Sequence, residues 1–108
     1  MDRKKIKKEL DIYIYRVKKH VDPEKIILFG SFARGEASSW SDIDILVISK
    51  FKGIPSKKRF DILYDLNNGL IHDHDIHAYD ITPKEYEQAK PWTIFSDIKK
   101  EGIILYEK

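Results

Sequence analysis

The sequence predicts a small α/β domain with a mixed β-sheet and with helices packed mainly on one face of that sheet. Segments with a helical repeat of apolar residues alternate with short apolar runs that are typical of strands. Glycine, proline and asparagine separate these segments, as expected for the turns between helices and strands. A chain of 108 residues can build one core of modest size, so we expect residues 1–108 to form one domain.

The first predicted element is an amphipathic helix. Its apolar residues recur at steps of three and four positions and would form one stripe, made of Ile6, Leu10, Tyr13, Ile14, Val17 and Val21. Asp22-Pro23 ends this helix, because a residue that precedes proline is pushed out of the helical region. The apolar runs 25–29 and 43–48 then predict two buried strands.

The middle of the chain predicts a further helix and a third strand. Ser56 is placed to cap a helix that ends before Gly69, since glycine readily adopts the left-handed conformation of a C-cap. The side chains that this helix would turn towards the core are Phe60, Leu63 and Tyr64. Residues 75–81 then alternate in the manner of a half-buried strand.

The C-terminal segment predicts two short helices and a last strand. Residues 82–85 read Thr-Pro-Lys-Glu, which combines a capping box with proline at the first helical position. Pro91 ends that helix, and a second short helix starts near Thr93. Gly102 then precedes an apolar strand at 103–106.

Composition narrows the classes of protein that fit the chain. The formal net charge of +2 is too small to indicate a nucleic-acid partner, and the basic groups lack the interleaved aromatic residues that bind single strands. The chain has no cysteine, which excludes disulfides and thiolate metal sites. Its apolar runs are too short to span a bilayer, and its basic N-terminus lacks an apolar signal core. We therefore expect a cytoplasmic protein with no membrane partner.

Two carboxylates at the head of the second predicted strand indicate a metal site. Asp42 and Asp44 are spaced i, i+2, so they project to the same side of a strand. Two such carboxylates repel each other by about 1 to 4 kcal/mol, depending on the effective dielectric. Mg²⁺ removes this conflict, because it prefers oxygen ligands and commonly holds a polyphosphate. The preceding Gly30-Ser31 turn can hold phosphate oxygens through its backbone N–H groups and its hydroxyl.

The glycine-serine turn and the aspartate pair together resemble the signature of a known family. Gly30-Ser31 and residues 41–47, which read Ser-Asp-Ile-Asp-Ile-Leu-Val, resemble the G-S-x10-D-x-D-h-h motif of the DNA polymerase β-like nucleotidyltransferases. Residues 32–37 are most similar to the minimal nucleotidyltransferases, or MNT proteins, of archaea and bacteria, and a looser likeness extends over roughly residues 5 to 90. The resemblance implies that Asp42 and Asp44 bind two Mg²⁺ ions, which position the triphosphate of ATP. It also implies that Gly30, Ser31 and Ser41 contribute to nucleotide binding.

Nucleotidyl transfer of this type also needs a third carboxylate on a neighbouring strand. The candidates are Asp73, Asp75 and Asp80. Alternation along the strand puts Asp75 on one face with His77, whereas Asp80 shares the core face unless the strand has ended. The tripeptide Asp75-Ile76-His77 also resembles the acidic third strand of the family. We therefore predict Asp75, with Asp80 as the open alternative, as third metal ligand and general base of a two-metal transfer that releases pyrophosphate.

Other polar residues near the motif admit more than one role. Arg34 either neutralises triphosphate charge or pairs with Glu36 at the surface. Trp40 lies in a polar loop, where it would stack on a base, anchor a partner or cover the edge of the core. His72 and His74 share a face, but no fixed third ligand accompanies them, so we discount zinc. We expect His77 to line the active-site face next to the metal ligands.

The resemblance implies an enzyme that transfers AMP from ATP to a hydroxyl group. MNT proteins often act beside a small all-helical HEPN protein in a toxin–antitoxin pair, in which the nucleotidyltransferase is the antitoxin and modifies a tyrosine of the toxin. Because the catalytic core takes up nearly all of the sequence, we expect a partner chain of this kind to present the acceptor. Two alternatives stay open: transfer to a small molecule or an RNA end, and a non-catalytic module that binds nucleotide or its partner and neutralises by masking. A homo-oligomer is compatible with each of them.

Overall fold

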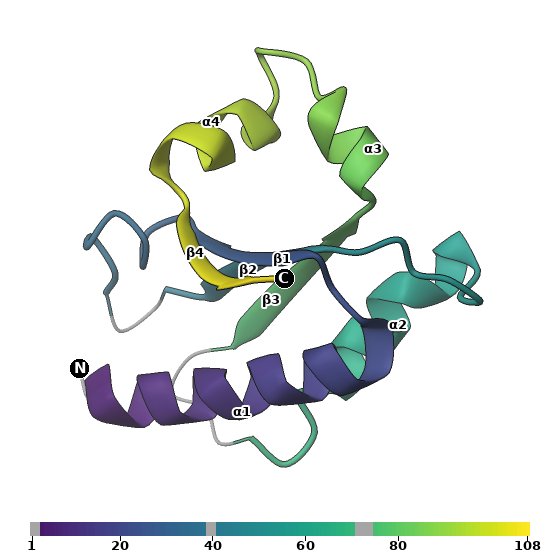
Figure 1. The fold of residues 1–108 in the computed structure, drawn as a ribbon. Coiled ribbons are helices and arrows are strands. Elements are labelled where there is room, and N and C mark those ends of the chain that lie inside the picture. Colours follow the sequence, from purple (N-terminus) through teal and green to yellow (C-terminus); the bar gives the residue numbers. More distant parts are fainter. Residues whose placement is uncertain (1–2, 39–40, 71–74) are drawn as a thin grey trace.

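The computed structural model describes residues 3–38, 41–70 and 75–108 of the chain. The helices are α1 (Arg3–Val21), α2 (Arg59–Asp65), α3 (Pro83–Glu87) and α4 (Ile94–Glu101), and a 3-10 turn, η1 (Ser56–Lys58), leads into α2. The strands are β1 (Lys25–Phe29), β2 (Ile43–Ile48), β3 (Ile76–Ile81) and β4 (Ile103–Glu107). Each predicted helix and strand is present, and the α/β class is confirmed (Figure 1). Among the residues that the structure describes, no helix is long and apolar enough to cross a membrane.

The strands form a mixed sheet in the order β3-β2-β1-β4. β1 pairs antiparallel with both β2 and β4, whereas β2 and β3 run parallel. The central strand β2 is buried along most of its length, as expected for a strand that is covered on both faces. Its register with β3 places Ile43 opposite Ile76 and Asp44 opposite His77. The residues that precede these two strands therefore also lie next to each other.

Helices α1 and α2 cover one face of the sheet (Figure 1). The α1 stripe packs there on alternate strand residues, and the buried cluster includes Leu10, Tyr13, Val17, Val21, Ile26, Ile43, Ile45, Val47, Leu63, Ile76 and Ala78. The hydroxyl of the fully buried Tyr13 donates a hydrogen bond of 2.7 Å to the carbonyl of Leu63 and so ties α1 to α2. Burial raises the pKa of the Tyr13 phenol above its ordinary value, so this hydroxyl keeps its proton.

The shorter helices α3 and α4 lie on the opposite face (Figure 1). Ile98 of α4 is buried there with Ile27, Phe29, Leu46, Ile48 and Ile81, and Tyr86 and Phe95 pack against this second cluster. Most of the helical residues thus pack on one face, as the sequence predicts. The two short helices cover the other face only in part, and Tyr79 stays exposed on it.

The core-facing side of α2 differs from the prediction. Phe60 and Tyr64 are 60% and 65% exposed, and their rings stack on each other at the surface with centroids 6.1 Å apart. Leu63 is buried as expected, and Ile62 and Leu66 pack beside it. The inward stripe is therefore Ile62, Leu63 and Leu66, which lie at helical spacing on the side of α2 next to the predicted one.

The predicted helix caps had different outcomes. Ser56 begins the 3-10 turn, and no side-chain cap is present at the start of η1 or of α2. The capping box before α3 is confirmed: the Glu85 N–H donates to the Thr82 hydroxyl over 3.2 Å, and the Thr82 N–H donates to the Glu85 carboxylate over 3.0 Å. This pair fixes the point where the chain leaves β3 and turns towards the second face.

Replacing Tyr13 with phenylalanine should lower the free energy of unfolding by about 1–2 kcal/mol, because the Leu63 carbonyl then loses a buried donor. Denaturant unfolding followed by circular dichroism measures this change. Tyr15→Phe is the matched control, since Tyr15 lies on the same helix but is exposed, and this variant should unfold like the wild type. Equal stabilities for Tyr13→Phe and the wild type would contradict the expectation.

Candidate active site

Strands β2 and β3 bring three carboxylates to one face of the sheet. Asp44 projects from β2 to the α4 side, because its neighbours Ile43 and Ile45 belong to the cluster under α1. Asp42 and Asp75 directly precede the two strands, and the Ile43 N–H donates to the Asp75 carbonyl over 2.8 Å. This bond holds the heads of the parallel strands side by side.

The structure separates the candidates for the third carboxylate. Strand β3 continues to Ile81, so Asp80 points to the opposite face, where its carboxylate lies 3.9 Å from the Arg59 guanidinium. Asp75 instead shares its face with His77 and with Asp42. Asp73, like His72 and His74, lies outside the described residues. Of the described candidates, only Asp75 is next to the aspartate pair.

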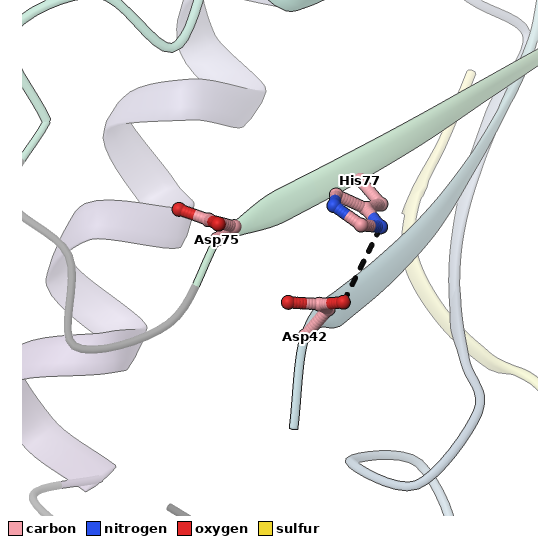
Figure 2. Close-up of side chains that lie close together, drawn as sticks. All are labelled: Asp42, Asp75 and His77. Carbon is pink, nitrogen blue, oxygen red and sulfur yellow. Dashed lines mark ion pairs between the residues drawn. The ribbon is translucent and has the colours of Figure 1, made fainter. Parts of the chain in front are cut away.

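Asp42, Asp75 and His77 form a group that could hold a metal ion (Figure 2). Each offers one ligand atom, and these atoms lie within 4.8 Å of one another. The Nδ1 atom of His77 is 3.5 Å from Oδ2 of Asp42. Asp44 lies outside this group, two residues after Asp42 and opposite His77 in the register of β2 and β3. These aspartates were predicted from the sequence, whereas the approach of His77 to Asp42 was not.

The electrostatics of this face favour a bound cation. Burial raises the pKa of Asp44, and the neighbouring Asp42 carboxylate raises it further, while His77 and Arg34 act in the opposite direction. Burial and the charges of Asp44 and Asp42 also raise the pKa of the Tyr79 phenol. The raised values mean that negative charge on this face is only partly neutralised by the protein itself.

Gly30 sits where a side chain would collide with the site. Its φ is +76°, and a Cβ built on it would overlap the Asp44 carboxylate. The chain then turns through residues 31–35, in which the Arg34 N–H donates to the Gly30 carbonyl and the Glu36 N–H donates to the Ser31 carbonyl. The glycine therefore permits both the left-handed turn and the approach of Asp44.

A cavity of about 540 Å³ opens beside Gly30 and Asp44. Its other lining residues are Phe29, Arg34, Tyr79, Ile94, Asp97, Ile98 and Glu101. This volume is in the range of pockets that hold small molecules. Sequence analysis missed the wall that α4 contributes. The signal was present in the spacing of residues 94, 97, 98 and 101, which places them on one face of a helix.

Comparison with known proteins identifies the family of this chain. The profile of the family described as "Polymerase beta, Nucleotidyltransferase" matches residues 4–108. A Methanocaldococcus jannaschii protein named "Putative protein adenylyltransferase MJ0604" is 33% identical over 85 residues, which are 77% of this chain and 78% of that protein. The chain belongs to the polymerase β nucleotidyltransferase family. The Gly30-Ser31 and Asp42-x-Asp44 residues lie within the part of the chain that the family profile matches.

Further relatives and solved structures agree with this assignment. "Putative protein adenylyltransferase MJ1305", from the same organism, is 36% identical over 80 residues, and the matched part of this nucleotidyltransferase spans 53% of that protein. The crystal structure of a "putative nucleotidyltransferase" from Sulfolobus solfataricus matches with a TM-score of 0.61 and 17% identity, over 100% of this chain and 91% of that one. A structure of the toxin–antitoxin MntA-HpeT matches with a TM-score of 0.62 and 21% identity, over 93% and 73%. The predicted nucleotidyltransferase family is confirmed, and these solved structures share its fold.

Two further residues predicted to bind nucleotide have polar partners within the protein. The Arg34 Nε atom is 3.0 Å from the Glu36 carboxylate, and Arg34 also lines the cavity of the nucleotidyltransferase, with Nη1 4.0 Å from Glu101. The Ser41 hydroxyl accepts a 2.9 Å hydrogen bond from the Ser38 N–H and so orders the approach to Asp42. Trp40 lies outside the described residues.

Replacing Gly30 with alanine should destabilise the nucleotidyltransferase more than replacing Gly35 does. Both glycines have a positive φ, so each variant incurs the left-handed penalty of roughly 1–2 kcal/mol. Only the Gly30 side chain meets Asp44, whereas a Cβ at Gly35 has nothing within 4 Å. Thermal unfolding of both variants measures the difference, and equal losses of stability would contradict the collision at Asp44.

Replacing Asp44 with asparagine should stabilise the metal-free protein, because burial and, to a smaller extent, the Asp42 carboxylate disfavour the charged form of Asp44. Asp44 is only partly buried, so solvent limits this gain to at most about 1 kcal/mol. The raised pKa of Asp44 means that the folded state binds its proton more readily than the unfolded state. In the wild type, the stability that comes from protonation of Asp44 is therefore lost as the pH rises above 3.8, the ordinary pKa of Asp, and through the raised pKa of the folded state. Unfolding at pH 4 and at pH 7 should show the advantage of Asp44→Asn at the higher pH, and a destabilised variant at pH 7 would refute this.

Proposed function

We propose that this nucleotidyltransferase moves AMP from Mg²⁺-ATP to a hydroxyl of a partner protein, as the antitoxin of a HEPN/MNT toxin–antitoxin pair. The observation that carries the proposal is the meeting of Asp42, Asp44 and Asp75 on one face, beside a cavity that starts at the Gly30 turn. Two relatives named as protein adenylyltransferases and a similar toxin–antitoxin structure with AMP-PNP support the choice of nucleotide and acceptor.

In this proposal the triphosphate binds at the Gly30-Ser31 turn and the rest of ATP fills the cavity. Gly30 lets the phosphates approach the backbone, and Arg34 exchanges its contact with Glu36 for phosphate oxygens. The α4 carboxylates of Asp97 and Glu101 repel phosphate and instead accept hydrogen bonds from sugar hydroxyls or from the amino group of the base. The nucleotide would therefore bind in one orientation, with its phosphates at Arg34 and its sugar and base at Asp97 and Glu101.

The three aspartates supply the oxygen ligands that Mg²⁺ prefers, and Asp42, Asp44 and Asp75 would hold two such ions. When bound, the ions neutralise charge on the triphosphate and on the leaving pyrophosphate. Asp75 accepts the proton of the acceptor hydroxyl while the hydroxyl oxygen forms a bond to the α-phosphorus. The bond from the α-phosphorus to the bridging oxygen breaks, and pyrophosphate leaves with the electron pair. Tyr79 remains a neutral phenol, because its pKa is raised.

An acceptor on a partner protein suits the position of Asp75. This residue is exposed and precedes β3, the strand at one edge of the sheet. A partner can therefore present a side-chain hydroxyl to Asp75 from outside the sheet, while the nucleotide enters from the α4 side. The two substrates then meet at the carboxylates without competing for one cavity.

The proposed function is tested with ATP labelled on its α-phosphate, Mg²⁺ and lysate from the native host. The wild type is compared with Asp42→Ala/Asp44→Ala, which should lose all labelling because no aspartate pair remains to hold the metal. Asp11→Ala/Asp61→Ala is the matched control, since it also removes two carboxylates but both are exposed on helices away from the site. The control should label like the wild type.

The labelled product decides between the proposed function and its alternatives. A protein band that resists nuclease and is lost only in Asp42→Ala/Asp44→Ala supports AMP transfer to a protein, and mass spectrometry then identifies the acceptor. A nuclease-sensitive product would move the acceptor to RNA, and a labelled small molecule would move it to a metabolite or drug. Binding of Mg²⁺-ATP without any labelled product would favour a module that neutralises by masking.

A further inference from the structure

His77 lies among the acidic residues of the site but has no role in the function proposed above. In the register of β2 and β3 it stands opposite Asp44, and it follows Asp75 by two residues, so it faces the same side as both. Figure 2 shows its ring directed at the Asp42 carboxylate, with Nδ1 3.5 Å from Oδ2. It thus places a nitrogen ligand where the carboxylates alone would offer oxygen.

We propose that His77 is a ligand of the metal ion held by Asp42 and Asp75, and that its nitrogen makes this position favour first-row transition ions over Mg²⁺. The inference rests on the proposed function, because it concerns the same metal site. Mg²⁺ is a hard ion that takes oxygen ligands and keeps its waters. A site with an imidazole ligand binds first-row transition ions, and its affinity rises from Mn²⁺ to Co²⁺ to Ni²⁺. The chain has no cysteine that could supply a competing soft ligand.

The distances fit one ion shared by these side chains. Two ligands at roughly 2.1 Å from an ion lie about 3 Å apart at a right angle and about 4.2 Å apart on opposite sides. The 3.5 Å between His77 and Asp42 falls inside this range. The 4.8 Å limit for the whole group lies just above it, so Asp75 has to turn its side chain slightly. Asp75 is exposed, and exposed side chains change rotamer on a nanosecond scale.

The main competing explanation is that His77 only forms an ion pair with Asp42. The side chains are 49% and 45% exposed, and ion pairs with this much solvent contact contribute at most about 1 kcal/mol. A paired His77 would orient Asp42 without touching the metal. The two explanations differ in whether a nitrogen nucleus is bonded to the ion, which can be measured directly.

Mn²⁺ and a non-hydrolysable ATP analogue with a methylene between the α- and β-phosphorus serve as probes of the full chain. Electron spin echo modulation of bound Mn²⁺ should show coupling to a directly bonded ¹⁴N in the wild type. The coupling should disappear in His77→Asn, which keeps a polar side chain of similar size. His20→Asn is the matched control, because His20 lies near the end of α1 with its ring bonded to the Arg16 carbonyl. His72→Asn/His74→Asn serves as a second control.

A second measurement compares the affinities of Co²⁺ and Mg²⁺ by titration calorimetry with the same analogue. The loss of even a residue that only supports a metal ligand lowers affinity about 10- to 100-fold. His77→Asn should therefore lower the ratio of Co²⁺ to Mg²⁺ affinity by about tenfold or more. His77→Asp should bring the ratio closer to one as well, since it makes the site all-oxygen. Neither substitution is expected to unfold the protein, because His77 is exposed.

The outcomes separate this inference from the proposed function. No ¹⁴N coupling in the wild type, coupling that survives His77→Asn, or coupling that is lost only in His72→Asn/His74→Asn would overturn the role of His77. AMP transfer with Mg²⁺ would stand in each of those cases. Conversely, ¹⁴N coupling that depends on His77 would uphold the metal ligand even if no labelled acceptor were found.

Discussion

The parallel pairing of β2 with β3 is the constraint on which the rest of the site depends. Ile45, Leu46 and Val47 of β2 are fully buried, and each contributes roughly 1.5–3 kcal/mol through burial of its side chain. Repulsion between neighbouring carboxylates amounts to about 1–4 kcal/mol. Burial of the strand therefore outweighs the repulsion at its head, and the register that buries β2 also fixes Asp44 opposite His77.

The helices cover the two faces of the sheet unequally, and this leaves the polar residues at the β2–β3 pairing accessible to solvent (Figure 1). The long helix α1 covers one face, and Tyr13 joins it to α2 across the core. On the other face α4 contacts the sheet through Ile98, and its polar side forms the far wall of the cavity. Gly30 is also needed for the position of Asp44, because a larger residue at that turn would occupy the space taken by the Asp44 carboxylate. The open face is thus a consequence of short helices and of one small residue.

Those parts of the site that depend on strand periodicity could be predicted from the sequence. The alternation of side chains placed Asp42 with Asp44, and it placed Asp75 on the face opposite to Asp80, as the structure has them. The inward face of α2 was predicted wrongly at Phe60 and Tyr64, since apolar residues occupy two adjacent faces of this helix and only the face with Ile62, Leu63 and Leu66 packs on the core. The spacing of residues 94, 97, 98 and 101 indicates one face of a helix, but the part of the sheet that this face covers could not be predicted, because the direction in which a helix crosses a sheet depends on packing between distant residues. The approach of His77 to Asp42 depends on the strand register in the same way.

In the proposed function, the negative charge that disfavours Asp44 in the metal-free protein is also what attracts a metal ion. Burial and neighbouring Asp42 raise the pKa of Asp44, so the charged form of this carboxylate is disfavoured, and in the proposed function a bound cation would stabilise that form. A ligand that binds only the folded state stabilises it by about 2.7 kcal/mol when its concentration is one hundred times its dissociation constant. This gain is comparable to the repulsion between the carboxylates. In the proposed function, binding of metal and nucleotide therefore opposes the stability of the free chain, and the buried apolar strand between the two helical layers is what lets the fold tolerate that conflict.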